Sequence, residues 1–297
     1  MSDTRRGLVT LHLGSLILGG TALFSKLIDT SALEITLWRS FIAAAVLLAF
    51  LLLRKSRIRL HNIQDAGVIV LLGVLLAVHW VTYFHSMQVS TVAVGIVAFF
   101  SHPVISALLE PLFDKQRPRP VDLISAFWVL CGIVIMMPEI NLASGATQGV
   151  LWGVFSALLF SLRNIIYKRY FSHYDSSLAM MYQCLIVGIV LLPFAGDFIV
   201  STSVENWILL GVLGVLFTAT PHTLFSYSLK FLSVKTASLI MCLVPLYATL
   251  LAALVLAELP AANTLIGGAM ILAAAIFESV LSSKQATAID QSDAQRS

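Results

Sequence analysis

Long apolar segments alternate with short polar gaps along nearly the whole chain. Each apolar segment runs for about 18–25 residues, which matches the ~30 Å hydrocarbon thickness of a bilayer at ~1.5 Å per helical residue. The pattern therefore predicts an all-α membrane protein with ten transmembrane helices. They are expected at about residues 8–28, 31–53, 64–86, 91–113, 121–138, 148–170, 177–197, 206–229, 235–257 and 261–282. The polar stretch 284–297 is predicted to be a disordered cytoplasmic tail.

The composition agrees with a lipid environment. Of the 297 residues 59% are hydrophobic and 11% are charged, whereas a soluble domain carries about 25% charged residues. The three cysteines lie in apolar segments without a spacing typical of zinc or redox sites, so we expect no metal and no cofactor. A P-loop and an HExxH motif are both absent from the sequence, and its aspartates lie at segment edges. These absences argue against an ATP-driven pump and a membrane enzyme, while a channel remains an alternative.

The basic residues alternate between gaps, which predicts an orientation. Fifteen of the 18 lysine and arginine residues lie in every second gap or at the two ends of the chain, and the five intervening gaps contain none. Loops rich in lysine and arginine stay in the cytoplasm. The pattern therefore predicts a multi-pass membrane protein with both termini in the cytoplasm and in contact with lipid. The net charge of +3 is explained by this placement and gives no evidence for binding nucleic acid.

The two halves of the chain, 1–140 and 148–283, resemble each other. At a constant offset of 142 residues, Val92 corresponds to Val234 and Pro103 corresponds to Pro245. Five helices per half is an odd number, so the second copy is inverted relative to the first. Inverted repeats are typical of secondary transporters that bind substrate between the halves. A proline inside a helix frees a carbonyl and bends the helix, so we expect Pro103 and Pro245 to serve in gating.

Each half also ends with a shared motif. A serine and a valine six residues later are followed by a proline, an acidic residue and a glycine-rich last helix, as in Ser228, Val234, Pro245, Glu258 and 267–268. This arrangement resembles the drug/metabolite transporter superfamily, specifically its EamA-type ten-span carriers and, among them, the YddG-like amino-acid exporters. The resemblance covers about residues 7–283. The first half departs from the motif, because its acid is Asp114, at 11 residues after the proline, with an additional Glu110.

The resemblance implies a secondary or facilitative carrier that exports amino acids and related metabolites across the bacterial inner membrane by alternating access. In the resembled family the third, fourth, eighth and ninth helices surround the central cavity. On the corresponding segments of this chain, polar and aromatic side chains recur at helical spacing. The predicted lining residues are His79, Tyr83, Phe99, His102, His222 and Phe225. The oligomeric state stays open, although the glycines at 267–268 would allow close helix packing within or between chains.

Three basic residues lie inside predicted helices. A charge at the bilayer centre costs at least ~2.5–3.5 kcal/mol, so each needs a partner or a path to water. Lys26 and Glu34 are equally far from the turn at residue 30, which predicts an ion pair, and Arg163 is close enough to a helix end to reach the surface. Arg39 has no acid at helical spacing, so we expect it, with its neighbour Trp38, to bind a substrate carboxylate. The alternative is that Arg39 bonds backbone carbonyls at a helix end.

Alternative substrates follow from the same residues. Arg39, Arg163 and Lys26 would suit a carrier of phosphorylated metabolites or nucleotide sugars, although they are spread along the membrane depth. A multidrug exporter is less favoured, because the first predicted helix lacks the acidic residue on which the resembled four-span relatives depend.

Overall fold

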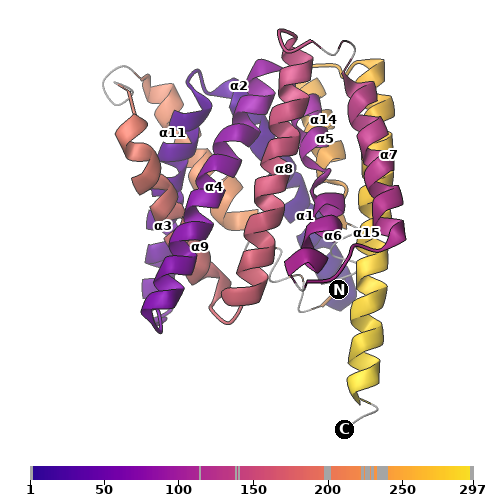
Figure 1. The fold of residues 1–297 in the computed structure, drawn as a ribbon. Coiled ribbons are helices and arrows are strands. Elements are labelled where there is room, and N and C mark those ends of the chain that lie inside the picture. The colour runs from indigo at the N-terminus through magenta and orange to yellow at the C-terminus, as the bar shows by residue number, and fades with distance from the viewer. Residues whose placement is uncertain are drawn as a thin grey trace.

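The computed structural model is helical in every element that it describes (Figure 1). It describes residues 3–113, 115–137, 139, 141–196, 202–221, 224, 228, 231–232 and 240–294. The elements are α1 (Asp3–Gly20), η1 (Thr21–Leu23), α2 (Phe24–Leu27), α3 (Ala32–Leu53), α4 (Ile63–Val89), α5 (Val92–Phe99), α6 (His102–Phe113), α7 (Pro120–Met136), α8 (Gly145–Tyr170), α9 (Ser176–Leu191), η2 (Leu192–Phe194), α11 (Val204–Gly214), η3 (Val215–Ala219), α14 (Val244–Val255) and α15 (Ala262–Ala294).

Within the part of the chain that the structure describes, seven helical stretches are long and apolar enough to cross a membrane. Three further apolar helices are shorter, namely Pro120–Met136, Val204–Ala219 and Val244–Val255. All of these stretches overlap the segments that the apolar pattern predicted, one stretch to each segment. Ten crossings, the inverted repeat and the cytoplasmic position of the termini stay predictions.

The helices stand side by side as an upright bundle (Figure 1). In that view α1 begins and α15 ends at the same end of the bundle, and the α3–α4 and α8–α9 connections lie there too. The α3–α4 connection is rich in lysine and arginine, the last turn of α8 carries Lys168 and Arg169, and the first turn of α1 carries Arg5 and Arg6. The basic segments named here therefore share one end of the molecule, which is the arrangement that the charge pattern requires.

Side chains cap the helices at the short connections. Ser31 begins α3 in a capping box with Glu34, and Asn62 accepts a hydrogen bond from the backbone N–H of Asp65 at the start of α4. Thr91 and Asp175 cap α5 and α9 in the same way. These caps satisfy backbone donors that are left open at the helix starts, so each connection can turn within a few residues.

The predicted fourth membrane segment is broken in the middle. Its first helix, α5, ends at Phe99 and its second, α6, begins at His102, one residue before Pro103. Because proline has no backbone N–H, the carbonyl of Phe99 loses its usual donor four residues later. Pro245 holds the equivalent place as the second residue of α14. The backbone is thus interrupted at Pro103, while a role of either proline in gating stays a prediction.

The core is a set of closely packed helix pairs. Helix α4 runs along α8 and α9, α3 packs on α9, and α7 packs on α15. At the last of these contacts two glycines face each other: a Cβ built on Gly267 would lie 2.3 Å from the carbonyl oxygen of Gly132. The glycines at 267–268 thus serve packing within the chain.

This contact makes a prediction about stability. We expect Gly267→Ala to lower the unfolding free energy by about 1–3 kcal/mol, because the added methyl group pushes two backbones apart. The matched control is Gly211→Ala in α11, where a Cβ would meet nothing within 4 Å. Thermal unfolding in detergent measures both variants. Equal midpoints would show that the close contact between α7 and α15 is not needed.

Candidate functional site

A cluster of aromatic rings joins four helices in the middle of the bundle. His79 and Tyr83 lie one turn apart on α4, while Phe99 ends α5 and His102 begins α6. The ring of Phe99 lies 5.3 Å from that of His79, 5.1 Å from that of Tyr83 and 5.0 Å from that of His102, measured between centroids. Phe160 of α8 closes the cluster, 5.1 Å from His79 and 4.9 Å from His102. Phe99 and His102 both face this cluster, on either side of the break before Pro103.

His79 is fixed by a pair of hydrogen bonds to α8. It is 4% exposed, and its Nδ1 lies 2.7 Å from the hydroxyl and 3.1 Å from the carbonyl oxygen of Ser156. The Ser156 hydroxyl in turn donates to the carbonyl of His79 at 3.0 Å. Since that hydroxyl proton is already used, both Ser156 oxygens accept from Nδ1–H. The other ring nitrogen, Nε2, therefore remains an acceptor in the neutral imidazole.

Arg39 is the most unusual residue of the site. Its side chain is 2% exposed, and its guanidinium carbon lies 3.9 Å from the ring centroid of Trp80 and 4.7 Å from that of Phe84. Its Nε and Nη2 atoms have no hydrogen-bond partner among the described residues. Stacking on two rings offsets part of the cost of burying the charge. Two free donors in a planar fork match the oxygens of a carboxylate.

Arg163 of α8 adds a second guanidinium nearby. Its Nε donates to Gln183 and its Nη1 to Asn164, both at 2.8 Å, so the half-buried guanidinium is held by neighbours on α8 and α9. Both arginines lie within electrostatic reach of the His79 ring and the Cys184 thiol. Among the described residues no carboxylate pairs with either guanidinium. The site is therefore positive and suits an anionic group.

The remaining predicted site residues lie elsewhere. Trp38 turns from Arg39 and packs on Trp207, at 5.2 Å between centroids, and on Phe41. Of the six predicted lining residues, four come together in the aromatic cluster. The other two, His222 and Phe225, lie outside the described residues.

The predicted ion pair between Lys26 and Glu34 is wrong. Lys26 Nζ donates to the carbonyls of Ser90 at 2.9 Å and Gln88 at 3.3 Å, and it lies 3.9 Å from a carboxylate oxygen of Glu258. The carbonyl end of α4 attracts the ammonium group. Glu34 is instead bound by Ser31 and Thr30 at its own helix start. The symmetry around residue 30 did not reveal these competing partners.

A polar cavity of about 450 Å³ opens beside the start of α3. Three carboxylates line it, from Asp29, Glu34 and Glu205. Glu34 precedes Arg39 by five helical residues, or about 7–8 Å along α3. These three carboxylates make the cavity acidic. It lies beside the first turn of α3, at the end of the bundle opposite to the basic segments (Figure 1).

The aromatic cluster contains one ring that the sequence did not predict. Phe160 lies at helical spacing from two polar residues of α8, four residues after Ser156 and three before Arg163. That spacing was the available signal. It is weak, because most neighbours on α8 are apolar as well.

Comparisons with known proteins agree with this fold. A family model described as the EamA-like transporter family matches residues 5–137 and again 147–280. An uncharacterized transporter of Archaeoglobus fulgidus is 26% identical over 91% of this chain and 94% of its own length. The uncharacterized inner membrane transporter YicL of Salmonella typhimurium is 23% identical over 97% of this chain and 100% of its own.

Two further similarities are more limited. The S-adenosylmethionine uptake transporter of Rickettsia conorii is 26% identical over 61% of this chain and 60% of its own. A solved crystal structure is similar with a TM-score of 0.60 and 18% identity, over 96% of this chain and 99% of that one, which supports the fold alone. The family model covers nearly the whole chain in two matches. The chain therefore belongs to the EamA-like transporter family, whose members are multi-pass membrane transporters rather than enzymes.

Proposed function

We propose that this transporter exports amino acids and related small metabolites, and that it binds their carboxylate at Arg39. The observation that carries the proposal is the buried guanidinium of Arg39, which has two unpaired donors beside an aromatic cluster. An unpaired charge inside a membrane protein is costly and is a functional-site candidate by default. A substrate carboxylate would satisfy both donors at once.

The neighbouring side chains suit the rest of such a substrate. Phe99 and Phe160 present apolar rings to a hydrophobic side chain, and the Tyr83 hydroxyl and His79 Nε2 offer polar contacts. Nε2 as an acceptor fits an ammonium group. On the second half, His222 and Phe225 remain our predicted contribution to the lining.

One relative supports this class of substrate. The Rickettsia conorii protein is named for S-adenosylmethionine, a molecule with an amino-acid end and an aromatic ring system. A guanidinium beside a cluster of rings suits both parts of that molecule. The direction of transport in our proposal, export, rests on the resemblance to amino-acid exporters.

The transport cycle that we propose is alternating access. Two inverted repeats of five helices each would rock against each other around the site. Both termini would lie in the cytoplasm. The protein would lie in a bacterial inner membrane, which is the location in the name of the YicL relative. The backbone interruptions at Pro103 and Pro245 are where the helices would bend. The acidic cavity beside Glu34 would then be the outer mouth.

A carrier of phosphorylated metabolites is the second candidate. Its support is that the charges of Arg39 and Arg163 both lie within electrostatic reach of the His79 ring. The sequence, however, placed the two arginines at different depths in the membrane. Against it, Arg163 already donates to Gln183 and Asn164, which leaves Arg39 as the open guanidinium. One free guanidinium suits a carboxylate better than a doubly charged phosphate.

Counterflow into liposomes separates the candidates. Purified protein is reconstituted with unlabelled amino acids, sugar phosphates or a cationic dye inside, and uptake of the labelled compound is followed. We expect saturable exchange of amino acids and little exchange of the other two classes. Exchange of sugar phosphates alone would favour the second candidate, and step-like electrical currents would contradict a carrier.

A further inference from the structure

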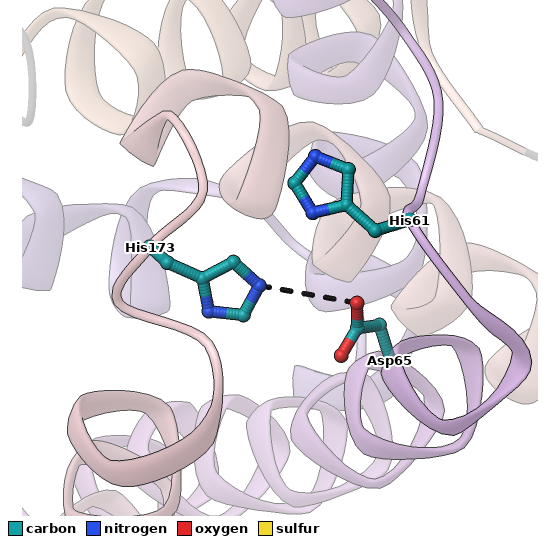
Figure 2. A group of neighbouring side chains, drawn as sticks. All are labelled: His61, Asp65 and His173. Atoms are coloured by element: carbon teal, nitrogen blue, oxygen red, sulfur yellow. Dashed lines mark ion pairs between the residues drawn. The ribbon is translucent and has the colours of Figure 1, made fainter.

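Three potential metal ligands lie close together at the end of the bundle that carries the basic segments. His61 lies just before α4, Asp65 lies in its first turn, and His173 lies in the loop between α8 and α9. Figure 2 shows the three side chains directed toward a common space. One ligand atom of each lies within 4.8 Å of the others, and His173 Nε2 lies 3.9 Å from Asp65 Oδ2. The cluster is far along α4 from the aromatic site, because His79 follows Asp65 by 14 residues, or about 21 Å.

The carboxylate of Asp65 is held in place by Tyr174. The Tyr174 hydroxyl donates to Asp65 Oδ2 at 2.6 Å and accepts from the backbone N–H of His61 at 2.5 Å. Asp65 is 8% exposed, and its own N–H donates to the side chain of Asn62. A ligand carboxylate in a metal site is commonly fixed by such an outer hydrogen bond.

The two imidazoles are exposed on one side, and both rings pack on the ring of Tyr174, at 4.7 Å for His61 and 4.4 Å for His173 between centroids. They also stack on each other with ring centroids 5.7 Å apart and planes 20° apart. Zinc bonds of ~2.0–2.2 Å place neighbouring ligand atoms of a tetrahedron about 3.4 Å apart. Side-chain rotations of His61 and His173 can close the remaining ~1.4 Å, while Asp65 stays fixed.

We propose that His61, Asp65 and His173 form a binding site for Zn²⁺ that leaves a fourth position open to water. Two imidazoles and one carboxylate are a donor set that Zn²⁺ takes in proteins, and exposure of both rings leaves the ion accessible to solvent. A bound ion would join the α3–α4 connection to the α8–α9 connection. Because these connections belong to the two matched halves of the chain, the ion would tie the halves together at this end.

Zinc titration of the full chain tests the proposal. The protein is purified in detergent with an affinity tag free of histidine, stripped with a chelator and titrated with Zn²⁺ in a calorimeter. We expect one tight site per chain and a higher thermal midpoint with Zn²⁺. His61→Ala and His173→Ala are each expected to weaken binding by at least about 100-fold. Tyr174→Phe removes no ligand but loses the hydroxyl that bonds Asp65 and the backbone N–H of His61, so it should weaken binding by about tenfold.

Two controls keep the outcome clear. His85→Ala removes a histidine of α4 outside the cluster, so its zinc affinity should equal that of the wild type. The metal-free variants should keep the wild-type thermal midpoint, since both histidines of the cluster are exposed. Co²⁺ in place of Zn²⁺ should give the visible spectrum of a four-coordinate ion. Equal zinc affinity of the wild type and the His61→Ala/His173→Ala double variant, or the spectrum of hydrated Co²⁺, would overturn the proposal.

Discussion

Replacing Arg39 by glutamine is expected to lower the apparent affinity for a carboxylate substrate by about 100-fold or more, while the protein still folds. The guanidinium is buried, and two of its donors await a partner. Removing one partner of a buried charge pair costs ~2–5 kcal/mol, which sets the size of the loss. Because the charge is unpaired without substrate, its removal should leave the unfolding free energy unchanged or raise it.

Two variants show whether the effect belongs to this guanidinium. Arg39→Lys keeps the charge but loses the planar fork, so we expect an intermediate loss of about tenfold. Arg54→Gln removes an exposed arginine just after α3 and should transport like the wild type. Apparent KM values from liposome exchange, normalised to folded protein, measure all three. An Arg39→Gln variant with the wild-type KM would remove Arg39 from the site.

The second large effect is expected at His79. His79→Ala removes a buried ring that contacts Phe99 and Phe160 and is bonded to Ser156. We expect a loss of about 3 kcal/mol in unfolding free energy, because a cavity remains in a packed core. The apparent KM should rise about tenfold as well, because the substrate loses its contact with the His79 ring and keeps only its contacts with the other rings of the cluster.

Neighbouring variants separate binding from stability at this position. His85→Ala on the same helix removes a half-buried ring that contacts Trp152, so it should cost under about 1 kcal/mol and leave KM unchanged. Ser156→Ala keeps the ring and the carbonyl acceptor of His79, so transport should persist. Thermal midpoints and KM values distinguish these cases. A destabilised His79→Ala protein with an unaltered KM would mean that the ring serves packing alone.

The sequence predicted the helices better than their contacts. Apolar length and the short gaps located the membrane segments, because a bilayer sets a minimum helix length. Which apolar side faces inward is not readable in the same way, since lipid is as apolar as the protein core. For this reason Phe160 of α8 was missed, and the two rings under Arg39, Trp80 and Phe84, were not expected either.

Polar residues carried more information about the site. His79, Tyr83 and His102 were noticeable because they are polar in apolar helices, and a deep Arg39 without a local acid already required an explanation. Partners distant in sequence were beyond reach. Lys26 meets Glu258 across 232 residues, and helical spacing says nothing about such a pair.

The contact between Arg39 and a substrate carboxylate is the central claim, and an amide analogue tests it most directly. Counterflow is measured for the amino acid that exchanges best and for the same amino acid as its amide, with wild-type protein and Arg39→Gln. The account predicts that the wild type exchanges the acid at least about 100-fold better than the amide, and that Arg39→Gln nearly loses this preference. Equal exchange of acid and amide by the wild type would contradict it.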